Sequence, residues 1–252
     1  MEEVGDMMIL TGRTIASALR PPYPYGGEFV SQFLFTIRLC WFPLLLSTMA
    51  ISYAAPGLQA ANFFQVFGAL DRLGGVFVLA AVREIGPLIT AIVLAGVAGT
   101  AITADLGARK IREELDALQV LGVDPVKNLV VPRFLALMLV TGLFNIYAIL
   151  FGLFGGLAAE SVKGQPLASF WATFFANITT TDLWGSVLKT TIFGAIIAIV
   201  CCYKGMSASG GAEGVGRAVN QAVVISFLGI GAFNTVFTQT LLATHPNILV
   251  MK

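Results

Sequence analysis

The sequence predicts an all-α integral membrane protein with five transmembrane helices. Of the 252 residues, 57% are hydrophobic and only 12% are charged, and the mean hydropathy is +0.85. Such a chain has too little polar surface to coat a water-soluble domain. A bilayer core of about 30 Å needs roughly 20 apolar residues per helix. Runs long enough recur without a charge at 39–70, 85–104, 134–159 and, apart from one histidine, 218–251.

We expect a transmembrane bundle over residues 33–243. Its five spans are placed at about 33–56, 82–104, 134–158, 184–203 and 219–243 from their apolar runs. Residues 73–82 are expected either to re-enter the membrane or to form a helix on its outer surface. Phe170 and Phe174 recur at helical spacing and predict a short surface helix before the fourth span.

Residues 1–27 are predicted to form an interfacial helix followed by a linker. Val4, Met8 and Ile15 fall on one side at helical spacing, which is typical of a helix lying in the membrane surface. The segment 21–27 then ends the helix, because it is rich in proline and glycine.

Basic residues favour a cytoplasmic N-terminus and an external C-terminus. In that orientation ten Lys and Arg residues fall on the inner side and five on the outer side. The inner residues are Arg13, Arg20, Arg38, Arg109, Lys110, Arg112, Lys127, Arg133, Lys204 and Arg217, against Arg72, Arg83, Lys163, Lys189 and Lys252 outside. A net charge of +1 indicates no nucleic-acid partner.

Small residues recur four positions apart in two spans. Ala95 with Gly99 and Gly152 with Gly156 would let helix backbones approach closely in lipid. Packing within one chain and dimerisation both explain these pairs. The three cysteines have no metal-ligand spacing and form no disulfide framework, so we expect them to be buried apolar residues.

A charged segment between the second and third spans is the clearest local pattern. Ile111, Leu115 and Leu118 form one apolar stripe of a helix over 111–121, and Gly122 with Asp124-Pro125 ends it. The other side carries Arg112, Glu113, Asp116 and Gln119. This pattern fits a helix that merely connects two spans, and it equally fits a helix that docks a cytosolic partner.

Three charges fall within or beside the apolar spans, namely Arg83, Glu84 and Lys189. A lone charge in a bilayer is costly, so these side chains should face the bundle interior, a cavity or the headgroups. One interpretation is structural, with Glu84 paired to a neighbouring cation such as Lys189. The other places them at a lipid site, where Arg83 would hold an anionic headgroup. Gly86-Pro87 would loosen the helix beside them.

The region 83–133 resembles the MlaE/YrbE permease family, the membrane subunits of ABC transporters that work with MCE lipid-binding proteins. The motifs that carry the resemblance are Arg83-Glu84-Ile85-Gly86-Pro87, Ala95-Gly96 with Gly99, Thr103-Ala104-Asp105-Leu106-Gly107, Glu113-Glu114-Leu115-Asp116-Ala117, Leu121-Gly122-Val123-Asp124-Pro125 and Pro132-Arg133. The segments ADLGARKIREELDA and LVVPR are similar to those of actinobacterial YrbE members.

The resemblance implies one permease domain over residues 1–252, with a cytoplasmic coupling helix at 109–124 that sits on a separate ABC ATPase. The matching coupling residues are Arg112, Glu113, Glu114, Leu115, Asp116, Leu118 and Asp124. It also implies a second permease subunit (a copy or a paralogue) and MCE proteins on the outer face. By this resemblance the chain is a non-enzymatic plasma-membrane subunit without a cofactor, since ATP and Mg would be bound by the ATPase. The lipid stays open among fatty acids, mycolic-type acids, sterols and phospholipids.

Three other functions are less well supported by the residues. Ser207 and Ser209 lack the pattern of a serine nucleophile, and His245 is expected at the opposite surface. The glycine-rich segment 210–216 lacks the lysine of a nucleotide-binding loop, and we expect it to be a flexible connection. An ion-coupled secondary lipid carrier remains the alternative, with Glu84 as its single candidate carboxylate in the membrane.

Overall fold

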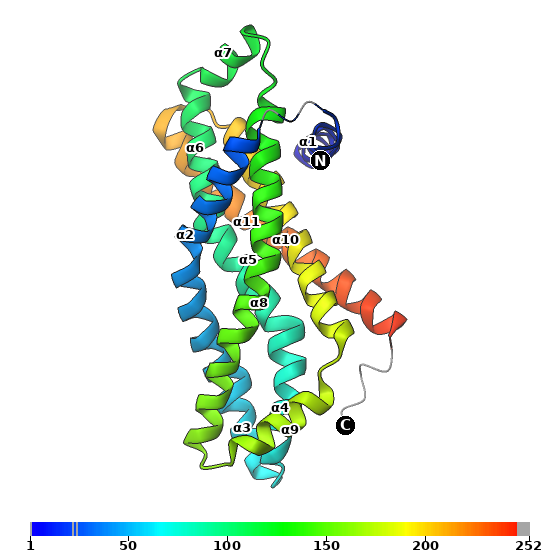
Figure 1. Ribbon diagram of the computed structural model, residues 1–252. Coiled ribbons are helices and arrows are strands. Elements are labelled where there is room, and N and C mark those ends of the chain that lie inside the picture. The colour runs from blue at the N-terminus through cyan, green and yellow to red at the C-terminus, as the bar shows by residue number, and fades with distance from the viewer. Residues whose placement is uncertain (1, 22, 24, 246–252) are drawn as a thin grey trace. The chain divides into compact units, whose positions relative to one another are not determined.

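The computed structural model describes residues 2–21, 23 and 25–245, and the regular structure of these residues is entirely helical (Figure 1). In chain order the helices are α1 Glu2–Leu19, α2 Gly26–Ser52, η1 Tyr53–Gln59, α3 Ala60–Val66, η2 Leu70–Arg72, α4 Leu73–Phe77, η3 Val78–Ile85, α5 Gly86–Leu94, η4 Ala95–Gly99, α6 Thr100–Ile111, α7 Glu114–Val120, η5 Val126–Val130, α8 Val131–Val162, α9 Leu167–Asn177, α10 Thr180–Met206 and α11 Gly211–Thr244.

Five helical stretches of the described residues are long and apolar enough to cross a membrane, which confirms the predicted fold class. They are Gly26–Val66, Leu70–Ile111, Val126–Val162, Thr180–Met206 and Gly211–Thr244. Each extends beyond its predicted bounds, because helices continue through residues more polar than the apolar runs used to find them.

Two local predictions were wrong because the helix of the neighbouring span extends further than predicted. Residues 73–82 are no separate helix on the surface, since α4 and η3 continue directly into α5 as part of the second span. Residues 211–216 are no flexible connection, since they form the first turns of α11. The chain bends where α11 begins, at Gly210 and Gly211, whose φ angles are +87° and +70°. Only glycine adopts such angles readily.

π-helical turns interrupt the first two spans and begin the third. They are η1, η3, η4 and η5, and a proline lies in or beside three of them: Pro56 in η1, Pro87 after η3 and Pro125 before η5. In η3 the widened register is visible at Gly86, whose N–H donates to Ala81 O, five residues back. A proline has no N–H to donate, and π-turns often occur at functional sites.

The chain divides into two compact units, and each of the five spans contributes to both. The first unit comprises Met1–Cys40, Ala91–Thr141 and Thr191–Ala232, and the second comprises Trp41–Thr90, Gly142–Thr190 and Phe233–Lys252.

In the first unit α6 and its preceding turn pack tightly on α10. A Cβ added at Gly99 would lie 2.8 Å from Cys201 Sγ, and one added at Gly205 would lie 2.8 Å from Leu106 Cβ. Thr103 Oγ1 donates to Cys201 O at 3.2 Å across the same contact. Gly99 therefore allows close packing within the chain. In lipid no hydrophobic effect drives helices together, so close contact between them contributes the stability instead.

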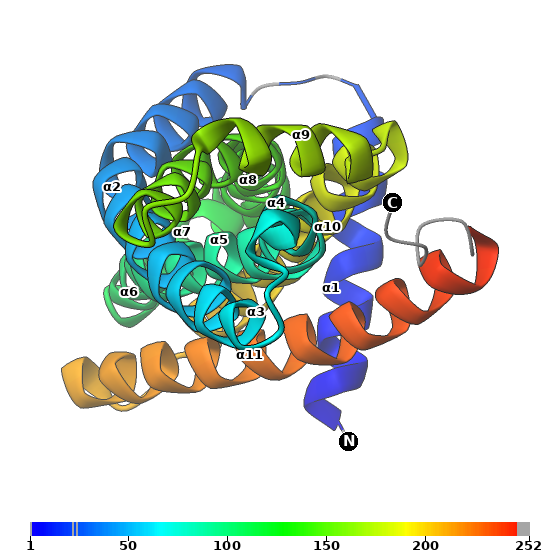
Figure 2. The ribbon, with the colours of Figure 1, turned by 90° about the horizontal axis from the view of Figure 1, so that it is seen from below.

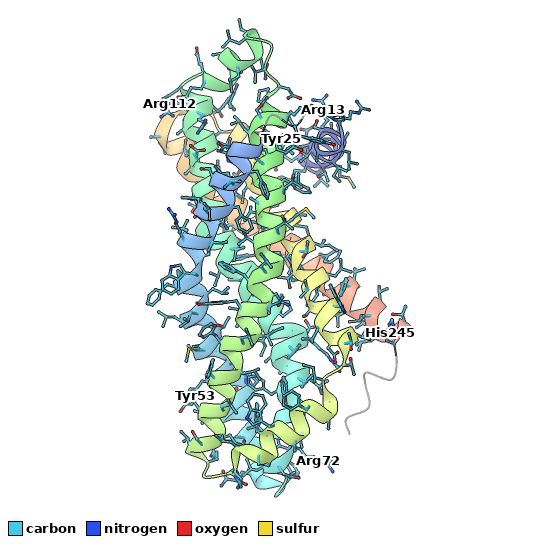
Figure 3. All side chains as sticks on the ribbon, in the orientation of Figure 1. Arg13, Tyr25, Tyr53, Arg72, Arg112 and His245 are labelled. Carbon is cyan, nitrogen blue, oxygen red and sulfur yellow. The ribbon has the colours of Figure 1, made fainter. Side chains whose placement is uncertain are left out.

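Helix α1 belongs to the first unit and keeps its apolar side uncovered. The exposed residues are Val4, Met8, Ile9, Ile15 and Leu19. The other side is held to α10: Lys204 Nζ lies 2.9 Å from Glu3 Oε2, and Tyr203 Oη donates to Asp6 Oδ2 at 3.2 Å. Figure 3 labels Arg13 on α1 and Tyr25 after it. Pro22 and Pro24 of the predicted linker lie outside the described residues. A helix bound by its polar side and bare on its apolar side fits the predicted interfacial helix.

In the second unit aromatic residues join α4 to α9, which lie side by side in both views (Figures 1 and 2). Phe77 packs edge-on against Phe170 with 5.6 Å between ring centroids, and Phe174 completes the cluster. The predicted short helix with Phe170 and Phe174 on one face is confirmed. Gly156 makes room for Phe77, because an added Cβ would lie 2.5 Å from its ring. Gly152 likewise meets Ser52, so this pair also packs within the chain.

Candidate functional site

The charged segment between the second and third spans forms two helices rather than the one predicted over 111–121. Helix α6 ends at Ile111, and α7 begins at Glu114. Between them Glu113 adopts φ +59°, in the left-handed region that non-glycine residues rarely occupy. This turn changes the direction of the chain (Figure 3, Arg112). It therefore breaks the predicted stripe: Leu115 is buried, whereas Ile111 stays exposed on α6.

Two ion pairs hold this turn from both sides. Lys110 Nζ lies 3.0 Å from Asp116 Oδ1, and Arg112 Nε lies 2.7 Å from Glu114 Oε1. Exposed pairs of this kind contribute little stability one by one. Here each pair spans the break between α6 and α7, so together they fix how α7 is attached to α6.

The predicted end of the segment is confirmed. Gly122 follows α7 with φ +75°, and Val123 N donates back to Leu118 O at 2.9 Å, as in a helix closed by glycine. Asp124 Oδ1 then accepts the N–H of Val126 at 2.9 Å at the start of the next helical segment. The chain between α7 and the third span is thus fixed by hydrogen bonds at both ends.

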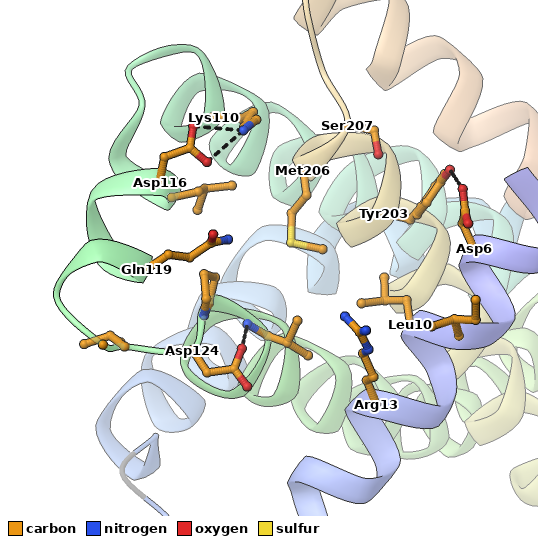
Figure 4. A pocket seen from close by; sticks show the side chains of 16 residues that line it. Asp6, Leu10, Arg13, Lys110, Asp116, Gln119, Asp124, Tyr203, Met206 and Ser207 are labelled. Atoms are coloured by element: carbon orange, nitrogen blue, oxygen red, sulfur yellow. Dashed lines mark hydrogen bonds and ion pairs between the residues drawn. The ribbon is translucent and has the colours of Figure 1, made fainter.

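A pocket of about 760 Å³ lies between α7 and α1 (Figure 4). Four segments line it: Asp6, Ile9, Leu10 and Arg13 of α1; Lys110, Leu115, Asp116 and Gln119 of α6 and α7; residues 122–126; and Tyr203, Met206 and Ser207 at the end of α10. Of the predicted coupling residues, Leu115, Asp116 and Asp124 line this pocket, and Arg112, Glu113, Glu114 and Leu118 do not. The sequence carried no signal that α1 would form the opposite wall.

In the second unit Arg83 is paired with a carboxylate that the sequence analysis missed. Arg83 Nε lies 2.6 Å from Asp182 Oδ1, and the Asp182 side chain is fully buried. Asp182 Oδ2 also accepts the N–H of Thr179 at 2.9 Å, while Thr179 Oγ1 accepts the N–H of Asp182 at 3.3 Å. This reciprocal arrangement is a capping box, and its spacing Thr-x-x-Asp before an apolar run could have identified Asp182.

Glu84 and Lys189 form a second pair beside the first. Lys189 Nζ lies 3.2 Å from Glu84 Oε1 and donates to Arg83 O at 2.7 Å. Glu84 also accepts from two side chains of α11: Thr238 Oγ1 donates to Oε1 at 2.8 Å, and Asn234 Nδ2 donates to Oε2 at 2.9 Å. The structure therefore joins η3, α10 and α11 through one polar network. No sequence pattern had marked Asn234 or Thr238.

Little space remains inside this network, but a larger apolar groove adjoins it. The cavity lined by Arg83, Glu84, Asp182 and Lys189 has a volume of about 20 Å³, enough for about one water molecule. The groove between α10 and α11 has about 420 Å³ and shares Gly185, Phe237 and Leu241 with that cavity. A volume of this size lies within the range of small-molecule sites. The remaining lining residues are Thr180, Thr181, Trp184 and Leu188.

With this geometry in view, residues 29–240 match the family described as Permease MlaE. The chain belongs to the MlaE permease family. As a family member it is a multi-pass membrane protein, and the resemblance first seen in residues 83–133 extends over all five spans.

Individual relatives agree with this assignment. A probable ABC transporter permease protein of Rickettsia typhi is 32% identical over 241 residues, covering 95% of this chain and 92% of the relative. The intermembrane phospholipid transport system permease protein MlaE of Haemophilus influenzae is 30% identical over 197 residues, covering 77% and 75%. The Arabidopsis thaliana protein TRIGALACTOSYLDIACYLGLYCEROL 1, chloroplastic, is 34% identical over 174 residues, covering 69% and 50%.

Proposed function

We propose that this MlaE-family permease is the membrane subunit of an ATP-driven transporter that imports lipids. The observation that carries the proposal is the match to the family over residues 29–240, which includes nearly all of the five spans. The Haemophilus relative is named for phospholipid transport, and it aligns with three quarters of this chain. The proposed cargo is a hydrophobic lipid, with phospholipids, fatty or mycolic-type acids and sterols as the classes to be tested.

The proposed ATPase contact is the turn between α6 and α7. Its charged residues Arg112, Glu113 and Glu114 face solvent or are half-exposed, and the ion pairs described above fix the turn to α6. Leu115 anchors α7 by its buried side chain. ATP and Mg would be bound by the ATPase, and this chain would contribute no catalytic residue.

The proposed lipid site lies in the second unit, where Arg83, Glu84 and Lys189 meet the groove between α10 and α11. Its polar end is already organised by ion pairs, and its apolar part offers about 420 Å³. Fixed charges beside an apolar groove suit a molecule with a polar head and a hydrocarbon tail. MCE proteins are the proposed lipid donors on the outer face.

A second permease subunit is proposed to cover the first and fifth spans. Only 22% and 17% of their most apolar windows are buried in this chain, against 56–67% for the other three. The partner is either a second copy or a paralogue.

The proposed location is the plasma membrane, with the N-terminus and α7 in the cytoplasm and the C-terminus outside, as the distribution of basic residues favours.

Reconstitution of the chain with its ATPase, partner permease and MCE protein tests the proposal. Labelled phospholipid in donor vesicles should reach the proteoliposomes only with ATP, and an ATPase variant unable to hydrolyse ATP should abolish transfer. A proton uncoupler added at constant ATP should have no effect. Transfer that persists without ATP hydrolysis and stops with the uncoupler would instead identify the ion-coupled carrier.

A further inference from the structure

A cavity of about 280 Å³ lies in the first unit among α2, α6 and α8, and it is separate from the pocket between α7 and α1. Each helix contributes residues from the part of its span nearest α7: the beginning of α2, the end of α6 and the beginning of α8. Span ends lie at the depth of the lipid headgroups. The lining residues are Ser31, Gln32 and Phe35 of α2, Ala101, Ile102, Asp105 and Arg109 of α6, and Arg133 of α8.

One wall of this cavity is a buried arginine with an unused donor. The Arg133 side chain is fully buried; its Nη1 donates to Leu129 O at 2.8 Å and its Nη2 to Asp105 Oδ2 at 2.6 Å. Its Nε finds no hydrogen-bond acceptor among the described residues. An unpaired donor on a buried charge is costly, so this arginine keeps unsatisfied hydrogen-bonding capacity beside the cavity.

The second guanidinium in the cavity is only partly engaged. Arg109 Nε lies 3.2 Å from Asp105 Oδ1, and its side chain remains 35% exposed. Its terminal nitrogens find no acceptor among the described residues. Ser31 and Gln32 add a hydroxyl and an amide to the same wall, although Gln32 Nε2 already donates to Glu28 Oε1 at 2.9 Å.

The residues that line the cavity carry one more positive than negative charge. Asp105 is the one carboxylate that lines the cavity, against the two arginines. Glu28, outside the lining, approaches Arg133 Nη2 at 3.5 Å and offsets a second positive charge. Arg38, outside the lining, lies one turn beyond Phe35 on α2, is exposed and makes no ion pair within the described residues. An exposed arginine in a span turns its guanidinium toward the headgroups.

The surroundings of the cavity are apolar and uncovered. Val30, Leu34 and Phe35 of α2 are 52%, 44% and 41% exposed, so no described residue of this chain covers this side of α2. A free anion in water would gain nothing from such surroundings, whereas a lipid brings its own tail to them. Basic pockets between transmembrane helices are typical binding places for anionic headgroups.

We propose that this cavity binds the phosphate group of an anionic phospholipid from the leaflet nearest α7. The phosphate oxygens accept hydrogen bonds from Arg109 and Ser31 beside the buried charge of Arg133, and the acyl chains lie along the exposed side of α2. This lipid is a resident ligand that is not transported, and its binding does not depend on the proposed transport function.

Retention of lipid by the purified full-length chain tests the proposal. Mass spectrometry of the intact chain in detergent should detect bound phosphatidylglycerol and no comparable binding of phosphatidylcholine. Arg109→Gln removes the accessible guanidinium, and Ser31→Phe fills the cavity without changing a charge. Each should reduce phosphatidylglycerol retention by about tenfold, the loss expected for one hydrogen bond to a charged group. Arg217→Gln, an exposed cation on α11, is the matched control and should retain the lipid.

Three results would overturn the proposal. One is equal retention of the two lipids, and another is undiminished retention in both Arg109→Gln and Ser31→Phe. The third concerns the source of the phosphate. Inorganic phosphate that raises the Tm of the chain in phosphatidylcholine nanodiscs, where phosphatidylglycerol does not, would assign the cavity to free phosphate. We expect instead that phosphatidylglycerol raises the Tm and that inorganic phosphate does not.

Discussion

The side-chain nitrogen of Lys189 donates a hydrogen bond to the carbonyl oxygen of Arg83 at 2.7 Å. In an α-helix this carbonyl would accept the N–H of the residue four positions later, which is Pro87 and has none to give. Lys189 also donates to Glu84 Oε1 and, at 3.5 Å, to Thr238 Oγ1. An ammonium group has three N–H donors, so the partners of Lys189 account for all of them. A lysine on α10 thus compensates for a proline in the second span.

Replacing Lys189 should therefore destabilise the second unit more than the loss of one charge suggests. Lys189→Met removes the cation paired with Glu84 and the donor to the Arg83 carbonyl, and we expect a loss of about 3 kcal/mol, measured as a lower Tm in detergent. The double variant Lys189→Met, Glu84→Gln should recover part of this loss, because it leaves no carboxylate without its cation. A double variant no more stable than Lys189→Met would refute the pairing.

Arg83→Ala should lower lipid transport in the reconstituted complex. Asp182→Asn is the matched comparison, because it weakens the 2.6 Å ion pair and leaves the guanidinium in place. If Arg83 contacts lipid, transport should fall much further in Arg83→Ala than in Asp182→Asn at equal Tm. Equal transport in the two variants would leave Arg83 with a purely structural role.

The α6–α7 turn should lose its ATPase when its acidic side is made basic. In Glu113→Lys, Asp116→Lys the second change places an ammonium where Lys110 now forms a 3.0 Å ion pair, so the surface becomes positive. Co-purification should show the permease without stoichiometric ATPase and with an unchanged Tm of the membrane bundle. Glu213→Lys, a charge reversal on an exposed residue of α11, should keep the ATPase. If the double variant still co-elutes at the wild-type ratio, the ATPase binds elsewhere.

Gly156→Ala should destabilise the chain, although alanine is the better helix former. Its Cβ would lie 2.5 Å from the Phe77 ring, so the aromatic cluster between α4 and α9 must shift, at a cost of about 1–3 kcal/mol. Gly96→Ala is the control, since an added Cβ there meets no atom within 4 Å. It should be neutral or stabilising by up to about 1 kcal/mol. Similar Tm values for the two variants would contradict the close packing seen at Gly156.

Hydropathy was sufficient to predict the five spans, because in a membrane every apolar run of that length must be helical. It could not place the helix ends, since hydrogen bonding continues into polar residues such as those of 211–216. The break at Glu113 escaped prediction because a left-handed turn normally uses glycine, and the residue there is a glutamate. Its conformation depends on the ion pairs of Lys110 and Arg112, which no local pattern reveals.

Some residues of the candidate lipid site could likewise be predicted from the sequence, and others could not. Arg83, Glu84 and Lys189 stood out because charge is rare in apolar runs, and Asp182 carried a recognisable capping pattern. Asn234 and Thr238 did not stand out, since polar uncharged residues are tolerated throughout spans. Only the rotation of α11 about its axis decides that these two residues face Glu84, and that rotation is a property of tertiary packing.

The close approach of α6 to α10 has a mechanical consequence. Gly99 faces the short side chains of Cys201 and Ile197, and Gly205 faces the Cβ of Leu106, so no long flexible side chain separates the two helices at these points. Long flexible side chains between two helices would absorb a displacement, whereas contacts this short would transmit it. We therefore expect a displacement of α6 to move α10 with it.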